Sequence, residues 1–178
     1  MLKKTALTTL IVLTLGVLAS AQQDKSKRPS PPAHTQCKFS DGKTITIDYS
    51  SPRMKGRKVF GGLVPYGEVW RTGANEATTF VTDTNLTVED KDVPAGSYTI
   101  FTVPEQDKWT LIVNKHTGEW GIPYKYQSEE LARVPMQVSK RSAPVEDFTI
   151  NLEQSGGSCT LQMSWENTQA SVKLSEKK

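Results

Sequence analysis

The chain has 178 residues, of which 36% are hydrophobic and 23% are charged, and its formal net charge is +3. A chain of this length can bury one sizeable hydrophobic core, so we expect a single folded domain. The near balance of charge gives no indication of a nucleic-acid partner or of a polybasic contact with a membrane.

The first 21 residues have the pattern of a secretory signal peptide. Lys3 and Lys4 form a basic start, residues 5–18 are an apolar run too short to span a bilayer comfortably, and Ala19-Ser20-Ala21 fits the cleavage rule. We expect cleavage after Ala21 and export to the periplasm or the extracellular space, with an uncleaved N-terminal anchor as the alternative. The remaining 157 residues carry a net charge of +1 and contain no further membrane-spanning run.

The rest of the chain divides into a tether, a domain and a short tail. Residues 22–35 are polar and rich in proline, which predicts a flexible tether. Residues 36–175 alternate apolar and polar side chains over short segments separated by turn residues, which is typical of half-buried strands. Residues 176–178 form a charged tail.

Asp41-Gly42 supplies the turn of a first hairpin, which places Ile45, Ile47 and Tyr49 on one face of a strand. One helical turn is expected near residues 128–132. The expected strands cover residues 37–39, 44–49, 78–83, 86–89, 97–103, 108–114, 134–139, 145–153, 158–166 and 170–174. Nine or ten strands without a long helical period predict an all-β fold, a single β-sandwich of mostly antiparallel strands.

The two cysteines, Cys37 and Cys159, are predicted to form a disulfide, because an even pair in an exported protein is most often bridged. The bridge would close a loop of more than 120 residues, and the alternative is two buried thiols. Two cysteines and two histidines, all distant in sequence, supply too few ligands for a zinc site. No metal and no cofactor are therefore expected.

Two irregular stretches interrupt the alternation, and each is either a site or a structural plug. The first, residues 56–78, contains five glycines and Pro65, and the second, residues 116–126, contains Gly118, Gly121 and Pro123. Glycine permits a positive φ and close approach, so both stretches are predicted to have special backbone conformations. The basic loop of residues 51–58 is expected to be solvated, and an anion-attracting rim is the alternative.

Aromatic and polar side chains in these stretches are the candidates for binding a glycan or another small ligand. They are Tyr66, Trp70, Arg71, Asn75, Trp120 and Tyr124. Rings can stack on a sugar while Arg71 or Asn75 orients a polar group. We favour the alternative that they are core and loop-pinning residues. Arg71 in particular is expected to be largely buried and paired with Glu76 or with backbone carbonyls.

Glu68 and Glu76 are the acid pair that could hydrolyse a glycosidic bond, which requires two carboxylates about 5–10 Å apart. Arg71 lies between them in sequence, and an ion pair with an arginine is the simpler role for either. The sequence contains no nucleophile elbow, phosphate loop or dinucleotide motif. We therefore expect a non-catalytic binding or structural module of the envelope or extracellular space, with a glycan hydrolase as the alternative.

Four segments carry a resemblance to a known family, and they read GRKVFGGLVPYGEVWRTGANEATTF, VPAGSYTIFTVP, KWTLIVNK and GEWGIP. In them the chain is similar to the domain-of-unknown-function family 2911 (DUF2911), over about residues 36–175. The resemblance implies an exported bacterial protein with a β-sandwich fold and assigns no catalytic residues. Its most recognisable block lies in the first irregular stretch and includes Trp70, Arg71, Gly73, Asn75 and Glu76.

Overall fold

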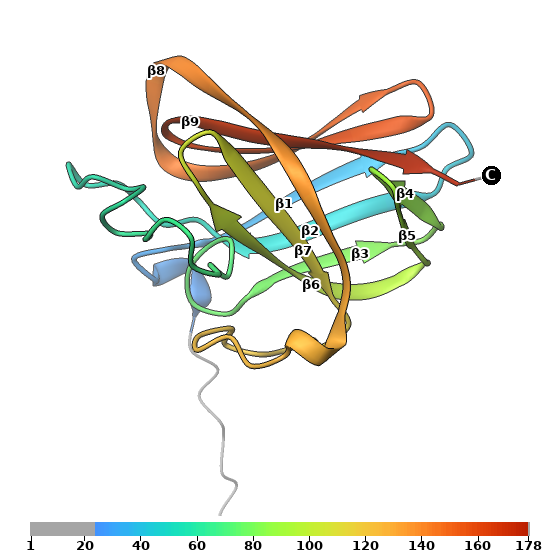
Figure 1. The fold of residues 1–178 in the computed structure, drawn as a ribbon, viewed down its shortest axis with the longest axis horizontal. Coiled ribbons are helices and arrows are strands. Elements are labelled where there is room, and N and C mark those ends of the chain that lie inside the picture. The colour runs from blue at the N-terminus through green and yellow to red at the C-terminus, as the bar shows by residue number, and fades with distance from the viewer. Residues whose placement is uncertain (1–23, 178) are drawn as a thin grey trace, which may run out of the picture.

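The computed structural model describes residues 24–177, so the predicted signal peptide and the last residue lie outside the described part. All described strands join one antiparallel nine-stranded sheet in the order β1-β2-β3-β6-β7-β8-β9-β4-β5 (Figure 1). The strands are β1 (Pro32–Lys38), β2 (Thr44–Ser50), β3 (Thr78–Thr82), β4 (Leu86–Val88), β5 (Lys91–Val93), β6 (Gly96–Pro104), β7 (Lys108–Asn114), β8 (Glu130–Ser155) and β9 (Ser158–Glu176). Two 3-10 turns, η1 (Lys25–Lys27) and η2 (Gln127–Glu129), complete the fold. No helix within residues 24–177 is long and apolar enough to cross a membrane.

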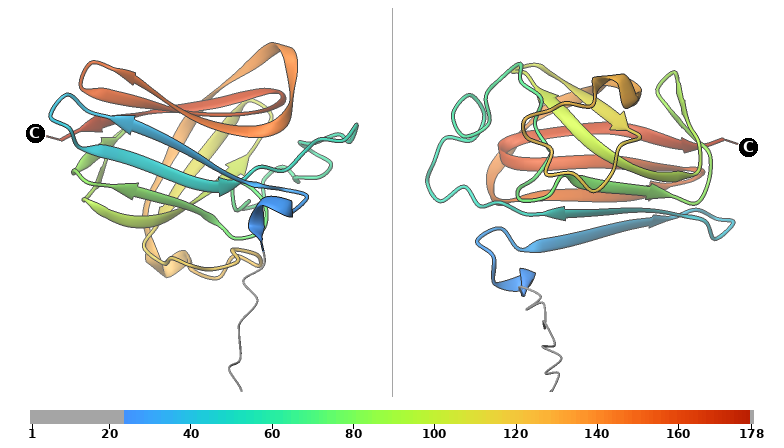
Figure 2. Two further views of the ribbon diagram at one scale, coloured as in Figure 1. Left: turned by 180° about the vertical axis from the view of Figure 1, so that it is seen from behind. Right: turned by 90° about the horizontal axis from the view of Figure 1, so that it is seen from below.

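The sheet curves back over itself, so that the β8–β9 hairpin faces β1 and β2 across the core (Figure 2). Strand β8 contacts β1 even though the two are far apart in the strand order. The all-β class is confirmed, and nine strands fall within the predicted number. The two layers belong to one curved sheet. The sequence pattern alone could not show whether the layers form one sheet or two separate sheets.

Strands β8 and β9 are longer than predicted because they bend without ending. The expected strands at residues 134–139 and 145–153 are both parts of β8, and those at 158–166 and 170–174 are both parts of β9. The register between β8 and β9 shifts between Lys140 and Thr149, and Glu166 has a φ of 53°. A β-bulge bends a strand and increases its twist while keeping it in the sheet, so one strand serves both layers.

The main core fills the space between the layers with alternate residues of the strands. In β2 these are Ile45, Ile47 and Tyr49, as predicted, and all three are buried. A smaller cluster of Ala77, Phe101 and Ile112 lies apart from the main core, on the other face of β6 and β7. The central strands are therefore covered on both faces, which explains their extra apolar residues.

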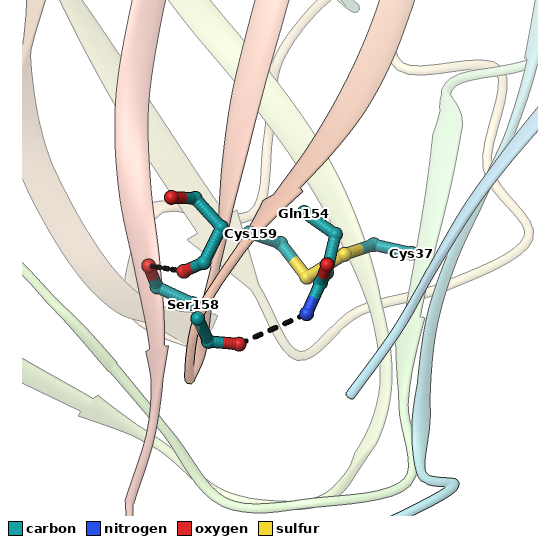
Figure 3. The surroundings of a disulfide bond; sticks show 6 residues. Cys37, Gln154, Ser158 and Cys159 are labelled. Carbon is teal, nitrogen blue, oxygen red and sulfur yellow. Dashed lines mark hydrogen bonds between the residues drawn. A yellow bond between two sulfur atoms is a disulfide. The ribbon is translucent and has the colours of Figure 1, made fainter. Parts of the chain in front are cut away.

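The predicted disulfide is confirmed. Cys37 in β1 and Cys159 in β9 have bonded sulfurs and Cα atoms 6.3 Å apart, over a sequence separation of 122 residues (Figure 3). Both residues are buried in the main core. The bond joins the edge strand β1 to the opposite layer of the curved sheet, and a disulfide is consistent with an exported protein.

The prediction of a flexible tether over residues 22–35 is wrong for the part that the structure describes. Strand β1 begins at Pro32, which pairs with Ser50. A proline is tolerated there because β1 is an edge strand and Pro32 is its first residue. The backbone amide of Ser51 also donates to the carbonyl of Pro31 at 2.9 Å. At the other end, β9 includes Glu176, the first residue of the predicted tail.

Candidate functional site

Trp70 is a core residue, 7% exposed. It extends the ladder alongside β6, where its amide donates to Thr102 at 2.7 Å and its carbonyl accepts from the same residue at 2.9 Å. Its indole nitrogen donates to the carbonyl of Gly73 at 3.0 Å. Its ring stacks on another indole at 5.9 Å between centroids and meets further aromatic rings edge-on; these partners are Trp165, Phe60, Trp109 and Phe148.

Tyr124 pins the second irregular stretch to the sheet. Its ring packs edge-on against Phe101 at 4.7 Å between centroids. Its hydroxyl donates to Glu130 at 2.7 Å and accepts from Asn114 at 3.0 Å. Burial, followed by the hydrogen bond to the Glu130 carboxylate, raises the pKa of Tyr124 above its ordinary value. These contacts hold the second irregular stretch against the sheet.

Arg71 is less buried than predicted, and of its two predicted kinds of partner it contacts a backbone carbonyl and not Glu76. The side chain is only partly buried, and its guanidinium carbon lies 5.0 Å from the centroid of the Trp120 ring. One terminal nitrogen makes a long 3.4 Å hydrogen bond to the carbonyl of Trp120, and the buried Nε has no hydrogen-bond partner. Burial lowers the pKa of Arg71 from its ordinary value, and an arginine remains a cation at neutral pH. The backbone-carbonyl part of the prediction holds, while the carboxylate part is wrong.

Glu76 pairs instead with the N-terminal segment. Its two oxygens accept from Arg28 Nη1 at 3.0 and 2.8 Å, and Lys25 Nζ lies 3.2 Å from Oε1. The neighbouring Asn75, whose φ is 58°, donates its side-chain amide to the carbonyl of Ser30 at 3.0 Å. The Glu76 backbone N–H, then Arg28 and Lys25, lower the pKa of Glu76 to about 2. Glu76 and Asn75 thus dock the N-terminal segment onto the first irregular stretch.

The Glu76 contact predicts a specific dependence of stability on pH. Because the pKa of Glu76 is about 2 in the folded protein and ordinarily 4.5, its contribution to stability is fully present above pH 4.5 and is lost as the pH falls towards 2. The free energy of unfolding of Glu76→Gln, measured with urea, is expected to lie below that of wild type at pH 7, by an amount that narrows between pH 4.5 and 2. The carboxylate is partly exposed, which keeps the effect modest.

Glu68→Gln is the matched control, since Glu68 is exposed and has no ion pair within residues 24–177. A gap between Glu76→Gln and wild type that stays constant over this pH range, or widens on acidification, would contradict the assignment of the Glu76 ion pairs.

Glu68 and Glu76 do not line a common cavity among those of residues 24–177. Glu76 is held by Arg28 and Lys25. Glu68 is exposed and is absent from the lining of the cavity beside Glu76. The two carboxyl groups of a glycosidase flank one glycosidic bond, so this placement gives the hydrolase alternative no support.

An apolar pocket opens beside Arg71, with a volume of about 260 Å³. We use the name apolar pocket for the hollow bounded chiefly by Leu63, Val64, Trp70, Arg71, Ile122 and Trp165. The large hydrophobic side chains exposed within residues 24–177 all come from the two irregular stretches; they are Leu63, Tyr66, Trp120 and Ile122. Leu63 and Ile122 line the pocket itself, and Trp120 contacts Arg71. Of the candidate rings, Trp70 lines the pocket and Tyr124 packs on Phe101, whereas Tyr66 and Trp120 are exposed and lie outside the pocket lining.

A second hollow, the acidic cavity, has a volume of about 290 Å³. Its lining includes the carboxylate residues Asp48, Glu76 and Glu119 together with Lys25. Sequence reasoning did not select Glu119, which is buried although it lies in a loop between two glycines. The feature of the sequence that could have pointed to Glu119 is its place in the GEWGIP segment. Among residues 24–177 no group of three or more histidine, cysteine or acidic side chains is arranged to hold a metal ion.

The two irregular stretches meet at Gly121. The amide of Ala77 donates to the carbonyl of Glu119 at 3.1 Å. Gly121 has a φ of 84°, and a Cβ atom there would lie 2.9 Å from Ala77 Cβ and 3.2 Å from Arg71 Cβ. Glycine is therefore required both by the backbone conformation and by the close approach.

Gly121→Ala is expected to lower the free energy of unfolding by about 1–3 kcal/mol more than Gly118→Ala, because overpacking adds to the cost of the backbone conformation. Gly118 is a matched control: its φ is 80°, but a Cβ there would meet nothing within 4 Å. Urea unfolding of the two variants measures the difference. Equal losses would show that the stretches are not closely packed at Gly121.

Comparison with known proteins identifies a family and no characterised relative. Residues 30–174 match the family described as "Protein of unknown function (DUF2911)". A search of curated proteins and a search of solved structures each find no match. The matched region contains both irregular stretches, the apolar pocket residues and the disulfide. The match spans most of the 178 residues, so the chain belongs to the DUF2911 family.

Proposed function

We propose that the mature protein is an exported, non-catalytic binding module whose ligand occupies the apolar pocket. The observation that carries this proposal is the pairing of an apolar floor with a cation whose hydrogen bonds are incomplete. Trp70 and Trp165 line the pocket, and Arg71 has one long hydrogen bond to a carbonyl and a buried Nε without a partner. Ligand sites are typically concave and apolar, with a few polar groups that fix orientation.

The lining favours a small ligand that combines an apolar ring or short hydrocarbon body with an anionic group. The apolar body would lie against Leu63, Ile122 and the indole floor, and the anion would accept from Arg71. Charge-assisted hydrogen bonds from arginine to a carboxylate are stronger than neutral ones. An acidic sugar can lay the C–H face of its ring on the indoles while its carboxylate accepts from Arg71, so an envelope or extracellular glycan belongs to the proposed class.

The alternatives receive less support from the same geometry. A glycan hydrolase would need Glu68 and Glu76 in one cleft, and Glu76 is held in ion pairs. A purely structural module would not need a pocket bordered by exposed Leu63 and Ile122. Exposed apolar side chains that gather in one place mark interaction sites more often than isolated ones do.

Tryptophan fluorescence can test the proposal, since Trp70 and Trp165 line the pocket. We expect 3-phenylpropionate or galacturonate to bind saturably, and their neutral counterparts 3-phenylpropanol and galactose to bind more weakly. Arg71→Gln should weaken binding of the acid by about 10-fold or more, the loss of one charge-assisted hydrogen bond. Arg57→Gln is the matched control, because Arg57 lines the same pocket while donating to the carbonyls of Met54 and Arg53.

The proposal is wrong if neither acid binds saturably, or if acid and neutral compounds bind equally well to wild type and to Arg71→Gln.

Export is tested separately by determining the N-terminus of the mature protein. A start at Gln22 is expected, and a retained leader would contradict the predicted cleavage.

A further inference from the structure

We infer that the acidic cavity is a second binding site, which takes a small organic cation such as a primary ammonium group. This inference is independent of the proposed function, because it concerns a different cavity and the opposite ligand charge. The cavity is formed by β2 and β3 together with both irregular stretches and η1; its residues used below are Asp48, Glu76, Ala77, Gly118, Glu119 and Lys25.

The first observation is the charge of the lining. Three carboxylate residues, Asp48, Glu76 and Glu119, share the cavity with one cationic side chain, Lys25. Asp48 also contacts His34 at 2.8 Å and lies at the exposed rim. Arg28 contacts Glu76 from outside the lining, so three carboxylates face two cationic side chains and a net negative charge remains. Walls with an excess of one charge raise the local concentration of ligands of opposite charge, which here are cations.

The second observation is an unsatisfied carboxylate. Glu119 is 9% exposed, and its Oε2 has only a long 3.4 Å hydrogen bond from Thr99. Its Oε1 is buried and has no hydrogen-bond partner in the structure. Leaving a buried polar atom without a partner is unfavourable, and it is more so for a charged group. Glu119 lines the cavity, so a rotation of its carboxylate would present this oxygen to a bound ammonium group, which would supply the missing donor.

The third observation is that the protein places its own ammonium group at this cavity. Lys25 Nζ lies 3.2 Å from Glu76 Oε1, and the Lys25 side chain is 59% exposed. Arg28 already holds both oxygens of Glu76, at 3.0 and 2.8 Å. Lys25 can therefore leave without leaving Glu76 unpaired, which makes it a displaceable internal competitor for a ligand ammonium.

Size and ligand count separate an organic cation from a metal ion. A volume of about 290 Å³ exceeds what a single ion fills. Metal ions such as Ca²⁺ take six to eight oxygen ligands, whereas residues 24–177 contain no cluster of three or more side chains arranged for metal binding. An ammonium group with a short hydrocarbon chain matches both the carboxylates and the small apolar wall at Ala77.

The test uses n-butylammonium chloride as the probe and n-butanol as its neutral counterpart, with backbone amide chemical shifts of the wild-type mature protein as the readout. We expect saturable shifts centred on Ala77 and Gly118 with butylammonium and none with butanol. No saturable shifts, equal effects of the two compounds, or shifts centred instead on Leu63 and Trp70 would overturn the inference.

Variants then assign the roles within the cavity. Glu119→Gln keeps the shape and removes the charge, and it should weaken butylammonium binding by about 10-fold or more. Lys25→Ala should strengthen binding about 3-fold, a surface ion-pair effect. Lys27→Ala is its matched control in the same 3-10 turn, because Lys27 does not line the cavity, and should leave the affinity unchanged.

Two further outcomes would overturn the inference. The first is an equal affinity of Glu119→Gln and wild type for butylammonium. The second is displacement of butylammonium by stoichiometric Ca²⁺, which would indicate an inorganic cation site. If Glu119→Gln does not fold, the wild-type shift map and the Lys25→Ala and Lys27→Ala pair still decide. Amide shifts at Ala77 and Gly118 report on the acidic cavity, whereas fluorescence of Trp70 and Trp165 reports on the apolar pocket, so failure here and failure of the apolar pocket are distinguishable.

Discussion

Replacing Cys37 and Cys159 together with alanine is expected to lower the free energy of unfolding by about 3–5 kcal/mol. The bond spans 122 residues of sequence, and the loss of chain entropy from closing a loop of this size corresponds to about 4–5 kcal/mol. The bond also joins β1, an edge strand, to β9 in the facing layer. Without it, the N-terminal edge of the curved sheet is held by the pairing of β1 with β2, by packing, and by the contacts of Glu76 and Asn75 with the segment before β1.

Urea unfolding of the oxidised wild type, the reduced wild type and the double alanine variant measures this effect. The reduced wild type is the matched control, since it keeps the two buried sulfurs and loses only the bond. We expect the reduced wild type and the double alanine variant to unfold at a lower urea concentration than the oxidised wild type. The alanine variant should unfold at the lowest concentration, because it also lacks two buried sulfurs. A loss below about 1 kcal/mol in both would show that the bond contributes little to stability.

The strands could be predicted because each half-buried segment alternates in a way that depends only on local sequence. Ile45, Ile47 and Tyr49 lie on the core face of β2 as predicted. The bend in β8 could not be predicted, because residues 139–144 are all exposed and look like a turn between two strands. The chain continues there as one bulged strand, because pairing with β9 on both sides of the bulge keeps it in the sheet.

The N-terminal segment was predicted as a tether because its composition is polar and rich in proline. Its order comes from long-range contacts: Arg28 with Glu76, and the carbonyl of Ser30 with Asn75. Neither pair is close in sequence, so no local pattern could indicate it. The disulfide is also long-range, but the predicted compartment and the presence of only two cysteines left one pairing.

From the sequence, the candidate site could be placed in the two irregular stretches. Which of their side chains are packed and which are exposed could not be predicted. Tryptophan and tyrosine have a large apolar ring and a polar tip, so the same residue suits a core or a binding surface. Trp70 and Tyr124 are packed, whereas Trp120 is 55% exposed. The burial of Glu119 and the partner of Glu76 both depend on how the stretches dock against each other and against the N-terminal segment.

Trp70→Ala is expected to lower the free energy of unfolding by about 3–5 kcal/mol, the range for deleting a buried aromatic side chain. Trp70 is 7% exposed, and its removal would leave a cavity among Phe60, Phe148 and Trp165. It would also free the carbonyl of Gly73, which accepts from the indole nitrogen. Thermal and urea unfolding of the variant beside wild type measure the loss.

Trp120→Ala is the matched control, because Trp120 is the same residue type in the second irregular stretch and is 55% exposed. Its loss removes a cation–π contact with Arg71, which at an exposed position contributes about 0.5–1 kcal/mol. A core role for Trp70 requires a loss several times larger than that of Trp120→Ala. If the two variants unfold alike, Trp70 does not hold the first irregular stretch to the sheet, and the floor of the apolar pocket is not part of the core.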